Sequence, residues 1–331
     1  MDPLTHALTG ALLARAGLNR AASRVAPLAV VASVWPDVDV AALLVSDIFY
    51  LELHRGWTHA LVAQPAQAAL LTLAWRWWAE RKETIGRGAL LRACLAAWFC
   101  LTLHVFFDTW NVYGVRPFIP WSWAWIRFDW VHVFDIWIWA VLLCGLLAPM
   151  LARLVDSEIG ARSGGGAGAA WMAFSLVAVY VGGRAVLHDR AVAAVESRLI
   201  RGETPLRVIA IPGAANPLRW KAVVETAGAW HILDAPLAGE LDPEQAVTFY
   251  KPEPSVLVEK ARSSATGRVF FDFAQAPAWR LMPGARVEGT TEVRVTDLRF
   301  STPASGGFSS DWLFDAQGRV LSEAFHFETK P

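Results

Sequence analysis

Long apolar runs in the first 190 residues constrain this chain more than any other feature of its sequence. Four runs of nearly twenty residues carry few charges, and they cover 60–79, 89–107, 133–151 and 169–187. A helix needs about 20 mostly apolar residues to cross the hydrocarbon core of a bilayer. We therefore predict that these runs are membrane helices. Buried helices of a soluble core are the alternative.

Two shorter apolar segments, 7–18 and 25–35, precede these runs. Each is shorter than the usual length of a span. They are therefore expected to form a short helical hairpin, a re-entrant pair or tilted helices. Pro36 is expected to end the second segment, because proline stops helix propagation. Residues 1–189 are thus predicted to form a mainly α membrane domain with about four to six membrane helices.

Residues 190–331 resemble a soluble protein instead. Short stretches of alternating apolar and polar residues recur there, separated by glycine- and proline-containing turns, and this pattern predicts an antiparallel β domain, either a small sandwich or an open barrel. The predicted strands lie at Leu206–Ile211, Lys221–Glu225, Val247–Tyr250, Arg268–Phe273, Arg286–Phe300, Trp312–Phe314 and Val320–Phe327.

The distribution of charge predicts the orientation of the membrane domain. The 30 basic and 30 acidic residues balance, which gives no reason to expect a nucleic-acid partner. If every apolar segment crosses once, ten Lys and Arg residues fall on one side, within 15–24, 76–92 and 153–162. The opposite short loops hold only Arg55, Arg116 and Arg127. Because cytoplasmic loops are enriched in Lys and Arg, the C-terminal domain is predicted on the non-cytoplasmic side of the inner (plasma) membrane, with Gly164-Gly165-Gly166 as a flexible turn on the other side.

Most of the histidines and several aspartates fall on that same non-cytoplasmic side. His104 and Asp108 are four residues apart, so that they share one helix face. Burying an ionisable group in or near lipid costs free energy, so such a pair is a candidate for a functional site. A structural His–Asp hydrogen bond is the alternative. Asp37 and Asp39 follow Pro36 in an expected extended turn, where they are either ligands or capping residues.

A third motif is His54-Arg55-Gly56-Trp57-Thr58-His59. Its two histidines cannot share a helix face. Thr58 is expected to cap a helix that begins at His59, and Thr5-His6 repeats this arrangement near the N-terminus. Arg55 is expected either to neutralise a phosphate oxygen or to extend its charge to the interface.

Imidazole and carboxylate groups in this number suit a divalent metal, with zinc first and manganese or iron as alternatives. The candidates exceed what one ion needs, so two or three ions are plausible. The sequence holds no serine-nucleophile motif and no phosphate-binding glycine loop. A metal-activated water is therefore the expected nucleophile.

These motifs together resemble the membrane-bound metal-dependent hydrolases known as YdjM-like inner-membrane proteins. The resemblance covers about residues 1–190 and rests on an ordered set of segments: Met1–His6, Pro36–Asp39, His54–His59, His104 to Asp108, Asn111–Gly114, Phe128–Trp130 and Asp135. The chain departs from the family pattern at Ala60, His132 and Ile136.

The family is thought to be distantly similar to zinc-dependent phospholipases C, which hold three zinc ions in a helical domain. The resemblance implies that the metal ligands are His6, Asp37, His59, His104 and Asp108, and that Asp129 and Asp135 are further ligands or support the ligands. It also implies that His54 and Asp39 are ligands or support them.

The sequence thus predicts a membrane-embedded metal-dependent hydrolase that cleaves a phosphoester of a lipid or lipid-like substrate. Asp37 or Asp39 would be the general base, with His54 and Arg55 also in the catalytic site. A non-enzymatic membrane protein with a structural metal site and a partner- or lipid-binding β domain is the main alternative. A transporter is less favoured, because its ionisable groups would lie near mid-span.

Overall fold

The computed structural model describes residues 1–159, 166–284 and 288–327, so that Gly164 and Gly165 of the predicted turn lie outside the described residues. The chain divides into two compact units, which are described separately. The first contains Met1–Asp39, His54–Val186 and Ala214–Asn216, and the second contains Val40–Leu53, Leu187–Gly213 and Pro217–Pro331. The main division thus falls three residues before the predicted boundary, and the segment 40–53 joins the second unit.

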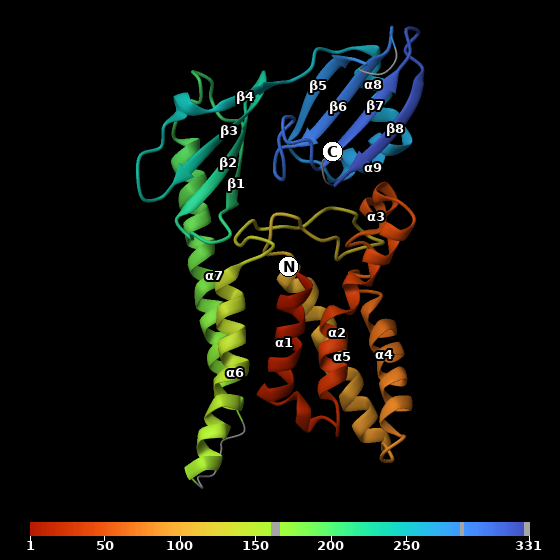
Figure 1. The fold of residues 1–331 in the computed structure, drawn as a ribbon, viewed down its shortest axis with the longest axis vertical. Coiled ribbons are helices and arrows are strands. Elements are labelled where there is room, and N and C mark those ends of the chain that lie inside the picture. Colours follow the sequence, from red (N-terminus) through yellow and green to blue (C-terminus); the bar gives the residue numbers. More distant parts are fainter. Residues whose placement is uncertain (160–165, 285–287, 328–331) are drawn as a thin grey trace. The chain divides into compact units, whose positions relative to one another are not determined.

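Two antiparallel helical hairpins form much of the first unit (Figure 1). The first hairpin pairs α1 (Pro3–Ala16) with α2 (Ala26–Val34), joined through the short 3₁₀ helix η1 (Leu18–Arg20), and the second pairs α4 (Gln64–Ala79) with α5 (Arg87–Asp108). Asp2 caps α1, where its carboxylate accepts a hydrogen bond from the Thr5 backbone amide at 3.0 Å. Thr5 therefore lies inside the helix and is not its cap.

The connections of the two hairpins meet at one end of the unit. The Trp75 indole donates a hydrogen bond to the Arg24 carbonyl at 2.9 Å, and Arg92 donates to the Ala21 carbonyl at 2.8 Å. These contacts bring together the basic segments 15–24 and 76–92, which the distribution of charge predicts on the same side of the membrane. The opposite end of the unit therefore carries the start of α1, which contains His6, and the end of α5, which contains Asp108.

The remaining long helices are α6 (Ile136–Ile159) and α7 (Ala167–Glu196). Among the described residues, four helical segments are long and apolar enough to cross a membrane: Ala26–Leu44, Arg87–Asp108, Ile136–Leu154 and Ala167–Glu196. The first of these continues beyond α2 through the 3₁₀ helix η2 (Trp35–Leu44). The α-helix does end before Pro36 as predicted, but the chain stays helical in a tighter form.

The run at 60–79 differs from the prediction, because α4 begins only at Gln64. Pro65 in its first turn explains this start, since proline is favoured there and excluded from a helix interior. The resulting helix has 16 residues. The fold class is otherwise as predicted, with a helical membrane domain followed by antiparallel sheets.

The second unit contains two four-stranded antiparallel sheets, each with its strands in sequence order. The first consists of β1 (Arg207–Pro212), β2 (Arg219–Glu225), β3 (Ala229–Pro236) and β4 (Val247–Tyr250), with the 3₁₀ helix η3 (Pro243–Gln245) before β4. The second consists of β5 (Pro277–Pro283), β6 (Thr291–Asp297), β7 (Ser309–Phe314) and β8 (Val320–His326). The first sheet packs Trp220 and Leu233 against Ala191 and Val195 of α7.

Three short helices accompany the second sheet: α3 (Asp47–Leu53), α8 (Val256–Ser263) and α9 (Ala265–Phe273). The predicted strand at Arg268–Phe273 was therefore wrong. Ser264 caps α9 by accepting a hydrogen bond from the Gly267 amide at 3.0 Å, and Phe270 and Phe273, three residues apart, are both buried. Strands β3 and β5 were not predicted, and residues 285–287 of the predicted strand at Arg286–Phe300 lie outside the described residues.

Candidate metal centre

Four side chains from three parts of the first unit converge at the end of α5. They are Asp37, His59, His104 and Asp108, and one ligand atom from each lies within 4.8 Å of the others. His104 and Asp108 stand one turn apart on α5, Asp37 comes from η2, and His59 comes from the turn before α4. Three of the four side chains are fully buried, and that of Asp37 is 13% exposed.

The spacing of these atoms fits a tetrahedral metal ion. Bonds of about 2.0–2.1 Å in a tetrahedron put the ligand atoms about 3.3–3.4 Å apart. The His59 and His104 Nε2 atoms are 3.2 Å apart, and each lies 3.3 Å from Asp108 Oδ2. Asp37 Oδ1 lies 3.7 Å from His59 Nε2 and 3.6 Å from His104 Nε2. The donor set of two imidazoles and two carboxylates could therefore hold a divalent ion.

Hydrogen bonds to Nδ1 of the two histidines leave their Nε2 atoms directed at the cluster. His104 Nδ1 lies 2.7 Å from the Ser33 carbonyl oxygen, which can only accept a proton. Nδ1 therefore carries the hydrogen, and the Nε2 lone pair faces the cluster. His59 Nδ1 lies 2.9 Å from the Thr58 hydroxyl, which in turn donates to Asp39 Oδ2 at 3.1 Å. The same tautomer is thereby favoured in both rings.

Asp39 organises the His54–His59 segment around the cluster. Its carboxylate accepts the Arg55 backbone amide at 2.8 Å and the Thr58 hydroxyl, and its Oδ1 lies 3.0 Å from His54 Nδ1. Burial lowers the pKa of His54 to about 4, against the opposing effect of Asp39. Burial likewise lowers the pKa of His59, so that both rings are neutral near pH 7. A neutral imidazole is the form that binds a metal.

His6 and Arg55 flank the other oxygen of Asp108. His6 Nε2 lies 3.4 Å from Asp108 Oδ1, and its ring stacks on His104 with centroids 3.7 Å apart. The Arg55 Nη2 atom lies 3.1 Å from the same oxygen, which also contacts the Met1 amino group. Arg55 is only 3% exposed and also donates to the Gly114 carbonyl. Of the two alternatives for Arg55, the extension of its charge to the interface is therefore wrong.

Residues 1–191 match the family model described as YdjM inner membrane protein. This chain belongs to the YdjM family of inner membrane proteins. The match contains every member of the Asp37–His59–His104–Asp108 cluster and more than half of the chain. Family membership and the apolar helices together indicate a membrane location.

One relative of this YdjM protein is the uncharacterized protein YfhP of Bacillus subtilis (strain 168). The two are 26% identical over 146 residues, which is 42% of this chain and 43% of YfhP. The chain thus matches less than half the length of that relative. No solved structure matches the chain.

Two further ligands predicted for this YdjM protein have other partners. Asp129 adopts a left-handed backbone conformation with φ +57° and pairs with Arg127. Asp135 accepts the Trp137 amide at 3.1 Å at the start of α6 and the Tyr180 hydroxyl at 3.0 Å. Neither residue is part of the cluster that the described residues form. The partly buried His132 lies next to Phe134, with its Nδ1 3.1 Å from the Phe134 carbonyl oxygen.

The local structure around the ligands differs from the prediction in two places. Thr58 does not cap a helix, because α4 begins five residues after His59 and has Ala63 at its N-cap. Asp37 and Asp39 lie in a 3₁₀ helix and not in an extended turn. The Ser33 carbonyl was missed altogether, since a backbone acceptor leaves no signal in residue type.

Proposed function

We propose that this YdjM-family protein is a membrane-embedded metal-dependent hydrolase that cleaves a phosphoester of a lipid or lipid-like substrate. The proposal is supported chiefly by the buried Asp37–His59–His104–Asp108 cluster, whose spacing and hydrogen bonds suit a divalent cation. Zinc is the first choice for this donor set, with manganese or iron as alternatives. Such an ion, when bound, would polarise a phosphoryl oxygen and activate a water molecule.

The protein residues around the cluster would have distinct tasks. Asp37 is the ligand with some exposure, and its Oδ2 has no hydrogen-bond partner. This free carboxylate oxygen is the best placed to take a proton from an attacking water. Asp39 accepts three hydrogen bonds, so we assign it to positioning and not to proton transfer. Arg55 would hold Asp108 in place.

The position of the cluster favours a lipid substrate. Asp108 is the last residue of the candidate span Arg87–Asp108, and Asp37 lies within the candidate span Ala26–Leu44. The phosphoester of a lipid lies at the same depth, where the hydrocarbon core meets the headgroup layer. A soluble phosphoester would have no need of a site at a helix end in the membrane.

Metal analysis and lipid hydrolysis on the purified full-length protein test this proposal. Wild type should retain about one or more equivalents of a transition metal and release phosphate-containing headgroups from vesicles of phosphatidylethanolamine and phosphatidylglycerol. His104→Ala should lose both properties, whereas His188→Ala, which alters a histidine outside the cluster, should lose neither. Wild type without bound metal would overturn the proposal. Bound metal without hydrolysis would favour a structural metal site.

A further inference from the structure

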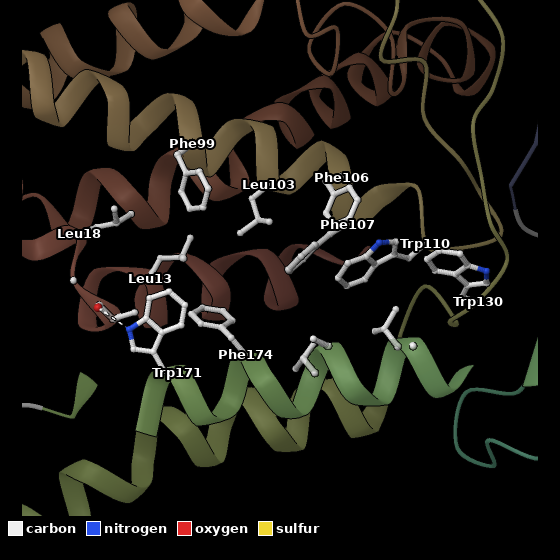
Figure 2. A pocket seen from close by; sticks show the side chains of 16 residues that line it. Leu13, Leu18, Phe99, Leu103, Phe106, Phe107, Trp110, Trp130, Trp171 and Phe174 are labelled. Carbon is white, nitrogen blue, oxygen red and sulfur yellow. Dashed lines mark hydrogen bonds between the residues drawn. The ribbon is translucent and has the colours of Figure 1, made fainter. Parts of the chain in front are cut away.

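An apolar groove of about 680 Å³ lies in the first unit between α7 on one side and α1 and α5 on the other (Figure 2). Its walls include Leu13 of α1, Leu103 and Phe107 of α5, and Phe174 and Gly182 of α7. None of the side chains that line the groove is charged. A groove with this lining does not suit an ion or a polar metabolite.

Tryptophans stand at both ends of this groove. At one end Trp171 donates a hydrogen bond to the Ala16 carbonyl at 3.2 Å. At the other end lie Trp110 and Trp130, as Figure 2 shows. Tryptophan favours the level of the lipid headgroups. The groove also reaches Phe99, which lies in the middle of the candidate span Arg87–Asp108.

The length of the groove matches one leaflet of a bilayer. From Trp171 to Gly182 helix α7 rises eleven residues, or about 16 Å at about 1.5 Å per residue. Half of a hydrocarbon core of about 30 Å is about 15 Å. A groove of this length accommodates a hydrocarbon chain from one leaflet.

An empty groove would forfeit the van der Waals contacts of its lining atoms. A flexible hydrocarbon chain of the bilayer supplies these contacts along the whole length of the groove.

The groove begins beside the metal-ligand cluster. Phe107 and Trp110 line the groove and belong to the same apolar cluster as Met1, whose amino group contacts Asp108. We infer that the groove binds a hydrocarbon chain of the lipid substrate and so holds the phosphoester at the end of α5. This inference rests on the proposed function for the identity of the lipid as a substrate.

Adjacent glycines provide a matched pair of variants. A Cβ atom at Gly182 or at Gly183 would meet no atom within 4 Å, so that both positions have room for a larger side chain. Gly182 lines the groove, whereas Gly183 is not among the residues that do so. Gly182→Phe should therefore obstruct the groove, and Gly183→Phe should add the same side chain to the same helix without obstructing it.

Photo-crosslinking tests chain binding without relying on activity. The full-length protein is reconstituted with phosphatidylglycerol that carries a diazirine on one acyl chain, and the labelled peptides are identified by mass spectrometry. Label should concentrate on α5 and α7 residues that line the groove. Gly182→Phe should lower it about tenfold through steric exclusion, and Gly183→Phe should leave it unchanged. Equal labelling of the two variants, or label spread evenly over the helices, would overturn the inference.

Hydrolysis assays separate this inference from the proposed function. Gly182→Phe should slow the cleavage of long-chain phosphatidylglycerol and spare its dibutyryl analogue, whereas Gly183→Phe should resemble wild type on both. Wild type that cleaves both lipids while the variants do not differ would overturn the role of the groove alone. If wild type cleaves neither lipid but is labelled in the groove, the proposed function is overturned. The groove would then bind lipid without holding a substrate.

Discussion

Asp39 shows how much of the candidate centre depends on residues that would never touch a metal. Its side chain is buried and joins His54, the Arg55 amide and the Thr58 hydroxyl, and through Thr58 it sets the hydrogen position on His59. Such partners fix the orientation and the tautomer of a ligand. The buried carboxylate therefore belongs to the site as much as the ligands do.

Replacing Asp39 with asparagine should weaken metal binding without removing a ligand. A neutral amide oxygen accepts hydrogen bonds more weakly than a carboxylate, and the amide nitrogen cannot accept one at all, so that the Thr58 hydroxyl and the tautomer of His59 are held less firmly. We expect metal affinity to fall by about 10–100-fold, measured by competition with a chromogenic chelator. Asp129→Asn is the control, because Asp129 pairs with Arg127 outside the cluster. An equal loss in both variants would contradict this assignment and support Asp129 as a ligand.

At the scale of elements, the contact between α1 and α2 connects helix packing to the centre. A Cβ atom at Gly10 would come within 2.7 Å of the Ala29 carbonyl oxygen and of the Ser33 hydroxyl. Small residues allow such close approach between membrane helices. Because the Ser33 carbonyl orients His104, the fit of these two helices also sets the direction of a ligand.

Gly10→Val should therefore reduce both stability and metal binding. The extra methyl groups would force α1 away from α2, at a cost of about 1–3 kcal/mol for overpacking. We expect a lower midpoint of thermal unfolding in detergent and faster loss of metal to a chelator. Gly168→Val serves as the control, since a Cβ there meets no atom within 4 Å. Normal metal retention in Gly10→Val would show that the helix contact does not support His104.

Helix geometry could be read from the sequence where the residues concerned lie within one element. His104 and Asp108 could be predicted as partners, because their spacing alone puts them on one helix face. The predicted helix start at His59 was wrong, because Pro65 in the first turn of α4 sets the start of that helix. Asp129 and Asp135 were assigned by resemblance, but they contact near neighbours in the sequence, Arg127 and the Trp137 amide, and only the contact of Asp135 with Tyr180 is distant in the sequence. The β pattern identified the second unit but mistook α9 for a strand, because aromatic residues suit either structure.

At the scale of the whole molecule, the basic connections between helices bear on which side of the membrane carries the centre. Both hairpin connections lie at the end opposite the cluster, and Arg24 and Arg92 make their contacts there. The Arg184 side chain, close to the end of the part of α7 that lies in the first unit, donates to the Trp130 carbonyl at 3.1 Å. The second unit then begins at Leu187. The chain therefore leaves the membrane unit on the side of the 109–135 segment.

Because Lys and Arg are enriched in cytoplasmic loops, we expect the connection after α4 in the cytoplasm and the second unit outside it. Single cysteines in a background without native cysteines test this, and Trp121→Cys, Lys82→Cys and Gln317→Cys all alter exposed positions. A membrane-impermeant maleimide applied to right-side-out spheroplasts should label the variants at 121 and 317, and the variant at 82 only after permeabilisation. The reverse pattern would put the metal centre in the cytoplasm. It would then draw its lipid substrate from the inner leaflet, with the groove beside α5 opening toward that leaflet.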